Sequence, residues 1–184
     1  MPINFDLNKI KDDYICNIYF DTGLWDVVTD ETSLCMALKM GFDKCYSVEI
    51  NPDFVLKAKF KFQNEFKEDK LDIFKGDSSK LKEYLQSIHI KDTDRFVFFL
   101  DSHGSGHGCP LIEELTAIKD INFKIKPIII LDDVRIIRTC VWSDSRYDGR
   151  NFEDVLKEKL KEINPDYEFS YLDGYIKDDC LLAS

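Results

Sequence analysis

The sequence predicts a doubly wound, Rossmann-like α/β fold, in which helices cover both faces of a mostly parallel sheet in three α/β/α layers. Strand-like and helix-like patterns alternate five times along the chain, and such alternation implies right-handed crossovers between parallel strands. Two runs, Phe96–Leu100 and Pro127–Leu131, are apolar without a polar alternation, as strands buried on both faces are. Two further strand-like runs close the chain and predict a C-terminal antiparallel strand.

The predicted strands are short apolar runs that stop at polar residues or at glycine. In chain order they are Ile15–Phe20, Cys45–Ile50, Leu71–Phe74, Phe96–Leu100, Pro127–Leu131, Tyr167–Tyr171 and Cys180–Ala183. The turn between the last two is left open between Asp173-Gly174 and Lys177–Asp179.

Helices are predicted between these strands from apolar spacing and from end signals. Leu34, Ala37 and Leu38 recur at helical spacing before Gly41, which suits the end of a helix. Asn51 and Pro52 form a helix start, because Asn can cap the first turn and Pro is tolerated within it. Further helices are predicted to begin near Ser79, Pro110 and Asn151.

The size and composition of the chain indicate one domain, residues 1–184. A chain of 184 residues suits a single core, and no Pro-rich, Gly-rich or repeated stretch marks a linker. No apolar run approaches the roughly 20 residues needed to cross a bilayer, and the first residues lack the hydrophobic core of a signal peptide. We therefore expect a cytoplasmic protein without a membrane partner.

Charge and cysteine content exclude some classes of function. A net charge of -10 disfavours nucleic acid as a partner, because such binding depends on Lys and Arg at the phosphates. Unless Arg135, Arg138, Arg146 and Arg150 form a local basic patch, this charge favours a small uncharged or cationic substrate over a polyanion. The six cysteines form no CxxC pair, so we expect buried free thiols rather than disulfides or a zinc site.

Unusual polar residues gather where the predicted strands end, and this coincidence is the main functional signal. They are Asp21-Thr22-Gly23, Glu49, Asp77, Asp101 with His103, and Asp132-Asp133. Doubly wound sheets bind ligands outside the carboxyl ends of their strands. Glu49, after the second strand, is placed to bind ribose hydroxyls, and Gly23 admits a ligand close to the backbone. The dehydrogenase pattern G-x-G-x-x-G is missing, which disfavours nicotinamide chemistry.

Three aspartates after the fourth and fifth strands predict a metal site. Asp101, Asp132 and Asp133 end neighbouring strands, and their carboxylates suit a hard cation such as Mg²⁺. The alternative is that Asp132-Asp133 begins a turn and Asp101 caps a loop. His103 is a candidate general base, with an unspecialised loop residue as the alternative.

In this order, the motifs resemble the class I S-adenosylmethionine-dependent methyltransferases over nearly the whole chain. YFDTGLW is similar to their first motif, SVEIN to their second and KGDS to their third. FFLDSH and IIILDD resemble the metal-dependent subgroup similar to macrocin O-methyltransferase and the cephalosporin-hydroxylase-like proteins. That subgroup has an Asp after strand four and an Asp pair after strand five.

The resemblance implies S-adenosylmethionine as cofactor, with Mg²⁺ as a second candidate. It also implies a homodimer, which is common in that family. It implies that Asp21 and Gly23 hold the methionine end of the cofactor, Glu49 its ribose and Asp77 its adenine. One difference is that the family's second glycine is missing, since Trp25–Glu31 separates Gly23 from Thr32-Ser33.

Three functions remain in competition. The first is methyl transfer to a hydroxyl of a small molecule, sugars among the candidates, with Asp101 and His103 as catalytic residues. The second is a glycosyltransferase that uses Asp101-Ser102-His103 as a metal–nucleotide motif. The third is a non-catalytic protein that kept the fold and lost the cofactor, which the glycine-poor loop after Gly23 suggests.

Overall fold

The computed structural model describes residues 3–102, 109–139 and 149–184. Within these residues seven strands form one sheet in the order β3-β2-β1-β4-β5-β7-β6. The strands are β1 (Ile18–Thr22), β2 (Lys44–Glu49), β3 (Leu71–Lys75), β4 (Phe96–Leu100), β5 (Ile128–Leu131), β6 (Phe169–Leu172) and β7 (Cys180–Ala183). Strands β1 to β5 run parallel, whereas β7 is antiparallel to both β5 and β6. The predicted mostly parallel sheet with an antiparallel C-terminal strand is confirmed.

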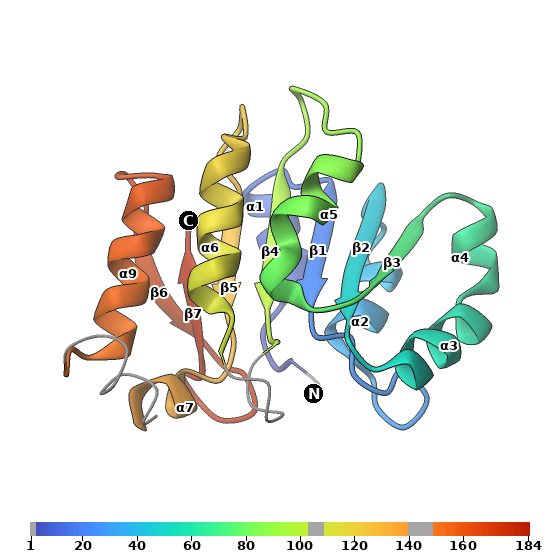
Figure 1. Cartoon of the computed structure of the whole chain (residues 1–184), viewed down its shortest axis with the longest axis horizontal. Coiled ribbons are helices and arrows are strands. Elements are labelled where there is room, and N and C mark those ends of the chain that lie inside the picture. The colour runs from blue at the N-terminus through green and yellow to red at the C-terminus, as the bar shows by residue number, and fades with distance from the viewer. Residues whose placement is uncertain (1–2, 103–108, 140–148) are drawn as a thin grey trace.

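Helices cover both faces of this sheet (Figure 1). One face carries α5 (Leu81–Ser87), α6 (Leu111–Ile121) and α9 (Phe152–Ile163), and the other carries α1 (Leu7–Asp13) and α2 (Ser33–Lys39). The short 3-10 helix η1 (Ser78–Lys80) precedes α5, while α3 (Pro52–Lys61) and α4 (Gln63–Lys67) connect β2 to β3, and α7 (Val134–Thr139) follows β5. Each face has its own apolar core, built around residues such as Phe98 and Leu115 on one side and Phe99 and Leu34 on the other. The three-layer prediction is therefore confirmed.

Several helix boundaries follow the predicted end signals. The side chain of Asn51 caps α3 by accepting from the backbone N–H of Asp53, and Pro52 is the first residue of that helix. The side chain of Asn151 accepts from Glu153 N at 2.9 Å at the start of α9. Gly41, with a φ of 68°, follows the end of α2 in the left-handed conformation that glycine tolerates.

The first strand lies further along the chain than the sequence predicts. Ile15 is not in the strand, since it has a φ of 53° and is 83% exposed in the turn after α1. The strand instead continues to Thr22, because β2 and β4 pair with it on both sides through that residue. Asp21 is therefore a residue of β1, paired with Ser47 of β2, and does not follow the strand.

The thiols have the environment that the sequence predicts. Cys16, Cys35, Cys45 and Cys180 are buried free cysteines, and Cys109 is buried as well. Cys140 lies outside the described residues. In the described part of the chain, every helix is too short or too polar to cross a membrane.

Candidate functional site

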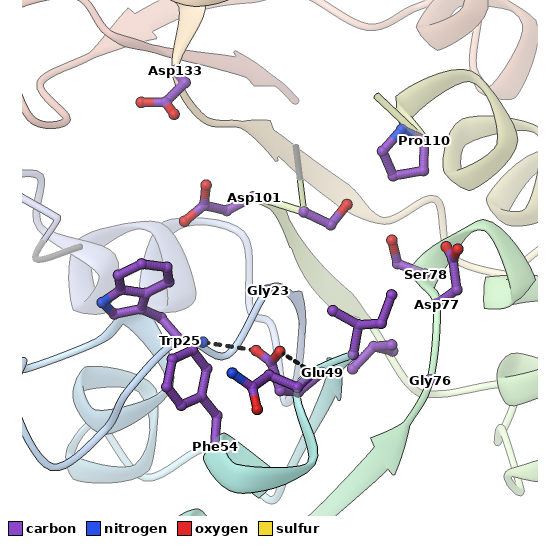
Figure 2. Close-up of a pocket in the computed structure, with 14 residues that line it drawn as sticks. Gly23, Trp25, Glu49, Phe54, Gly76, Asp77, Ser78, Asp101, Pro110 and Asp133 are labelled. Atoms are coloured by element: carbon purple, nitrogen blue, oxygen red, sulfur yellow. Dashed lines mark hydrogen bonds between the residues drawn. The ribbon is translucent and has the colours of Figure 1, made fainter. Parts of the chain in front are cut away.

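A cavity of about 420 Å³ opens at the carboxyl ends of β1 to β4 (Figure 2). This volume lies in the range typical of small-molecule sites. Its apolar wall comes from Trp25, Val48, Ile50, Phe54 and Pro110, and its carboxylates from Glu49, Asp77, Asp101 and Asp133. The cavity stands at the sheet edge where the strand-end residues were predicted to bind a ligand.

Backbone hydrogen bonds extend the sheet pairing one residue beyond the strands and so hold these residues in place. Gly23 N donates to Val48 O at 3.0 Å, and Asp101 N donates to Thr22 O at 2.9 Å. Gly76 N donates to Glu49 O, also at 2.9 Å. The base of the cavity is thus built on the sheet itself, which gives its side chains a rigid support.

Gly23 is required where β1 meets β4. Its φ of 105° is a conformation that residues with a side chain rarely adopt. A Cβ added there would also overlap the backbone carbonyl oxygen of Asp101. Only glycine therefore allows the ends of these two strands to approach each other beneath the cavity.

We expect Gly23→Ala to lower the free energy of unfolding by roughly 2–4 kcal/mol, since backbone strain and a clash with a main-chain carbonyl act together. Gly41→Ala is the matched control. Gly41 also has a positive φ, but nothing lies within 4 Å of the position of its added Cβ. It should lose about 1 kcal/mol from strain alone. Urea unfolding of both variants measures the difference, and equal losses would show that the approach of Asp101 places no demand on residue 23.

Glu49 is held at the end of β2 with its carboxylate fixed by two backbone amides. Oε1 accepts from Asn51 N at 2.7 Å, and Oε2 accepts from Trp25 N at 3.0 Å. The residue is only 6% exposed, yet it lines the cavity. Each carboxylate oxygen can accept more than one hydrogen bond, so both can still receive hydroxyl groups from a ligand.

The loop after Gly23 lacks the second glycine of the resembled family. Contacts of its own side chains hold it in place. Leu24 and Val27 are buried, and Asp26 forms an ion pair with Lys57 of α3. Trp25, at a φ of 60°, packs its ring 5.5 Å from that of Phe54. Figure 2 shows these two aromatic rings forming one side of the cavity next to Glu49.

Asp77 lies at the end of β3, as predicted, and lines the cavity together with Ser78. Its Oδ1 accepts from Ser79 N at 2.9 Å and caps η1. Asp77 is exposed whereas Ser78 is buried, so the pair forms an edge of the cavity that is open to solvent.

Asp21 does not line the cavity, although it was predicted to hold the cofactor with Gly23. It is fully buried in β1, where Ser33 of α2 donates to its Oδ2 at 3.1 Å. Its other oxygen, Oδ1, has no hydrogen-bond partner among the described residues. Burial raises the pKa of the Asp21 carboxyl to about 7; nearby serine hydroxyls oppose this rise in part, and the charge of Glu49 adds to it.

Of the two predicted catalytic residues, Asp101 lines the cavity and His103 lies outside the described residues. Asp101 follows β4 and lines the cavity between Gly23 and the end of β5 (Figure 2). The neighbouring Ser102 donates from its hydroxyl to Glu114 Oε1 of α6 at 2.6 Å. His103 lies outside the described residues, so its role as a general base stays a prediction.

The predicted metal ligands are brought together only in part. Asp132 and Asp133 group with Asp179, one oxygen of each lying within 4.8 Å of the others, and Asp101 does not belong to this group. Asp179 joins because β7 lies antiparallel beside β5. The donors do not fit a divalent cation as they stand, because the guanidinium of Arg135 already forms ion pairs with Asp133 and Asp179.

Three residues of this region were not predicted from the sequence. Phe54 borders the cavity, whereas Val55 and Ala58 are the buried residues of α3. Nothing in the local sequence predicts that Arg135 and Asp179 pair with each other. Only the position of an acidic residue directly before the last strand could have suggested Asp179.

No protein-family model matches the sequence, and a search of curated proteins gives no match. Solved structures do match. The O-methyltransferase from Bacillus cereus, in complex with SAH, is 13% identical with a TM-score of 0.63, covering 96% of this chain and 77% of its own. TomG from Streptomyces achromogenes, in complex with SAM, is 12% identical with a TM-score of 0.62, covering 96% and 76%.

A third structure covers nearly all of the chain. A provisionally named caffeoyl-CoA O-methyltransferase from Staphylococcus aureus is 14% identical with a TM-score of 0.62, covering 99% of this chain and 84% of its own. At such low identity these likenesses establish the fold alone, a fold that the chain shares with these methyltransferases.

Proposed function

We propose that the protein transfers a methyl group from S-adenosylmethionine to a hydroxyl group of a small molecule. The observation that carries this proposal is the buried carboxylate of Glu49, fixed at the end of β2 and facing a cavity of suitable size. A fold shared with proteins that hold SAM or SAH supports it. The carboxylates of Glu49, Asp77 and Asp101 at the cavity also suit a cofactor that carries an ammonium and a sulfonium.

The residues of the cavity fit the parts of this cofactor. Glu49 would accept hydrogen bonds from the ribose hydroxyls, and Asp77 with Ser78 would face the adenine. Gly23 lets a ligand approach the backbone at the end of β1. When bound, the cofactor supplies an electrophilic methyl group.

In this proposal Asp101, which lines the cavity, assists the acceptor. Its carboxylate would accept a hydrogen bond from the acceptor hydroxyl, orient the oxygen for an in-line approach and take its proton as the new oxygen–carbon bond forms. Transfer of the methyl group from the cofactor's sulfur to this oxygen would give the methyl ether and S-adenosylhomocysteine as products. Trp25, Phe54 and Ile50 give the cavity an apolar wall, against which the nonpolar parts of a bound ligand would pack.

Titration calorimetry with S-adenosylhomocysteine tests the cofactor, and nucleotide sugars serve as the competing ligands. We expect a single site for S-adenosylhomocysteine. Methyl transfer is then measured with a labelled methyl group and a panel of small alcohols that includes sugars. Binding of a nucleotide sugar instead would favour a glycosyltransferase, and binding of neither class would favour a non-catalytic protein.

A further inference from the structure

The carboxylates at the end of β5 form a buried acidic group that needs a compensating positive charge. The side chain of Asp179 is fully buried, that of Asp133 is 7% exposed, and Asp132 is also buried. Buried carboxylates this close together repel each other and lose their hydration, so a cation must be nearby for all of them to stay ionised.

We propose that the guanidinium of Arg135 takes, in this protein, the place that a divalent cation would occupy among Asp132, Asp133 and Asp179. Arg135 Nη1 lies 2.6 Å from Asp133 Oδ1 and also pairs with Asp179 Oδ2. A planar guanidinium presents several N–H groups in fixed directions, which suits two carboxylates at once.

Arg135 is held in this position by more than its charge. Its backbone N–H donates to Asp179 Oδ1 at 3.1 Å, and the ring of Tyr175 lies 5.2 Å from its guanidinium carbon. The preceding residue, Val134, donates from its backbone N–H to Asp179 O at 2.7 Å. The start of α7 is therefore bound to the segment before β7 through main chain and side chain together.

The third carboxylate of the group, that of Asp132, also has hydrogen-bond partners. Asp132 Oδ1 accepts from Cys180 Sγ at 3.0 Å and from Asp133 N at 2.8 Å. Mg²⁺ requires nearly octahedral oxygen ligands and gives up its water reluctantly, so it competes poorly with donors that are already committed. Arg135 therefore fixes Asp133 at the cavity wall. In the proposed reaction a side chain, and not a metal-bound water, then accepts the proton of the acceptor hydroxyl.

Replacement of the arginine should turn the group into a metal site. We expect no change in the melting temperature of the wild type on adding MgCl2 or MnCl2. Arg135→Gln should melt at a lower temperature without metal, because it leaves the carboxylates uncompensated, and MnCl2 should restore several degrees by binding them. Arg135→Lys keeps the charge and should resemble the wild type in its lack of response.

Arg138→Gln provides the matched control on the same helix. Arg138 pairs with Glu153 at 2.6 Å, a single carboxylate that Lys157 also contacts, so its loss should destabilise the protein without any rescue by MnCl2. If Arg135→Gln does not fold, Mn²⁺ titration of the wild type followed by electron paramagnetic resonance decides the question alone.

A single saturable Mn²⁺ site on the wild type, lost in Asp133→Asn, would overturn the proposal, and so would equal metal responses of the wild type and Arg135→Gln. A saturable Mn²⁺ site on folded Arg135→Gln and none on the wild type is the supporting result; where Arg135→Gln does not fold, the absence of such a site on the wild type supports the proposal. These measurements need neither cofactor nor acceptor, so their failure is distinct from a failure of the proposed methyl transfer.

Discussion

Glu49→Gln should weaken the binding of S-adenosylhomocysteine by at least about tenfold while the protein stays folded. The substitution keeps the shape of the side chain but removes the charge and one acceptor oxygen. Loss of a charged hydrogen-bond partner costs about 1.5–3 kcal/mol, which corresponds to roughly a tenfold to hundredfold change in affinity. Titration calorimetry of the wild type and the variant measures the change.

A second ligand separates ribose recognition from disturbance of the loop. Glu49 also accepts a hydrogen bond from Trp25 N, so a carboxylate that does not contact the ligand would still lower the affinity of the variant if its loss displaced Trp25. An analogue of S-adenosylhomocysteine without the ribose hydroxyls should bind the wild type weakly. The Glu49→Gln substitution should lower the affinity for this analogue only a little further. Additive losses would contradict the ribose contact.

The control for charge is Glu31→Gln. Glu31 is an exposed acid of the same loop that pairs with Lys39 and does not line the cavity. Its replacement should leave the affinity unchanged. A loss equal to that of Glu49→Gln would mean that the general negative charge of the region, and not a contact, attracts the ligand.

Asp21→Asn should change how the stability of the protein depends on pH. Burial raises the pKa of the Asp21 carboxyl to about 7 in the folded protein, against an ordinary value of 3.8. The folded state therefore binds one more proton than the unfolded state between these two values. The contribution of the protonated Asp21 carboxyl to the stability of the protein is fully present below pH 3.8 and is lost as the pH rises through 7.

The expected size of this effect is large. A difference of about 3 pKa units corresponds to roughly 4 kcal/mol in the free energy of unfolding. Asn is a neutral side chain of the same shape, so it avoids the cost of a buried charge beside Glu49. The stability of Asp21→Asn relative to the wild type should rise by about this amount between pH 4 and pH 8.

Urea unfolding at several pH values measures this difference, with Asp92→Asn as the control. Asp92 is exposed, so its replacement should leave the pH dependence of the wild type unchanged. Parallel curves for the wild type and Asp21→Asn would show that folding does not raise the pKa of the Asp21 carboxyl, and would contradict this prediction.

The pattern of the sequence alone determined the fold and the edge at which the site lies. The bounds of β4 and β7 agree with the prediction, because unbroken apolar runs that end at polar residues leave little freedom in where a buried strand stops. Glu49, Asp77 and Asp101 line the cavity for a related reason. In parallel strands, each carboxyl end meets the same edge of the sheet, so residues after separate strands gather there.

The role of Asp21 was decided by pairing between strands. Local sequence places it after a short apolar run, in the expected position of a ligand contact. In the structure, β2 and β4 hydrogen-bond to β1 on both sides as far as Thr22 and draw the aspartate into the sheet. Its side chain then lies beneath α2, against Ser33. The β-propensity of one segment does not predict how far the neighbouring strands continue to hydrogen-bond to it.

Tertiary structure also decided the fate of the acidic pair after β5. Asp132-Asp133 alone reads as part of a metal site with Asp101, since neighbouring strands were expected to bring these residues together. The antiparallel insertion of β7 beside β5 brings Asp179 to them instead. The first turn of α7 then directs Arg135 against the same carboxylates. Residues distant in sequence set the electrostatics of this group, and only the folded chain brings their charges together.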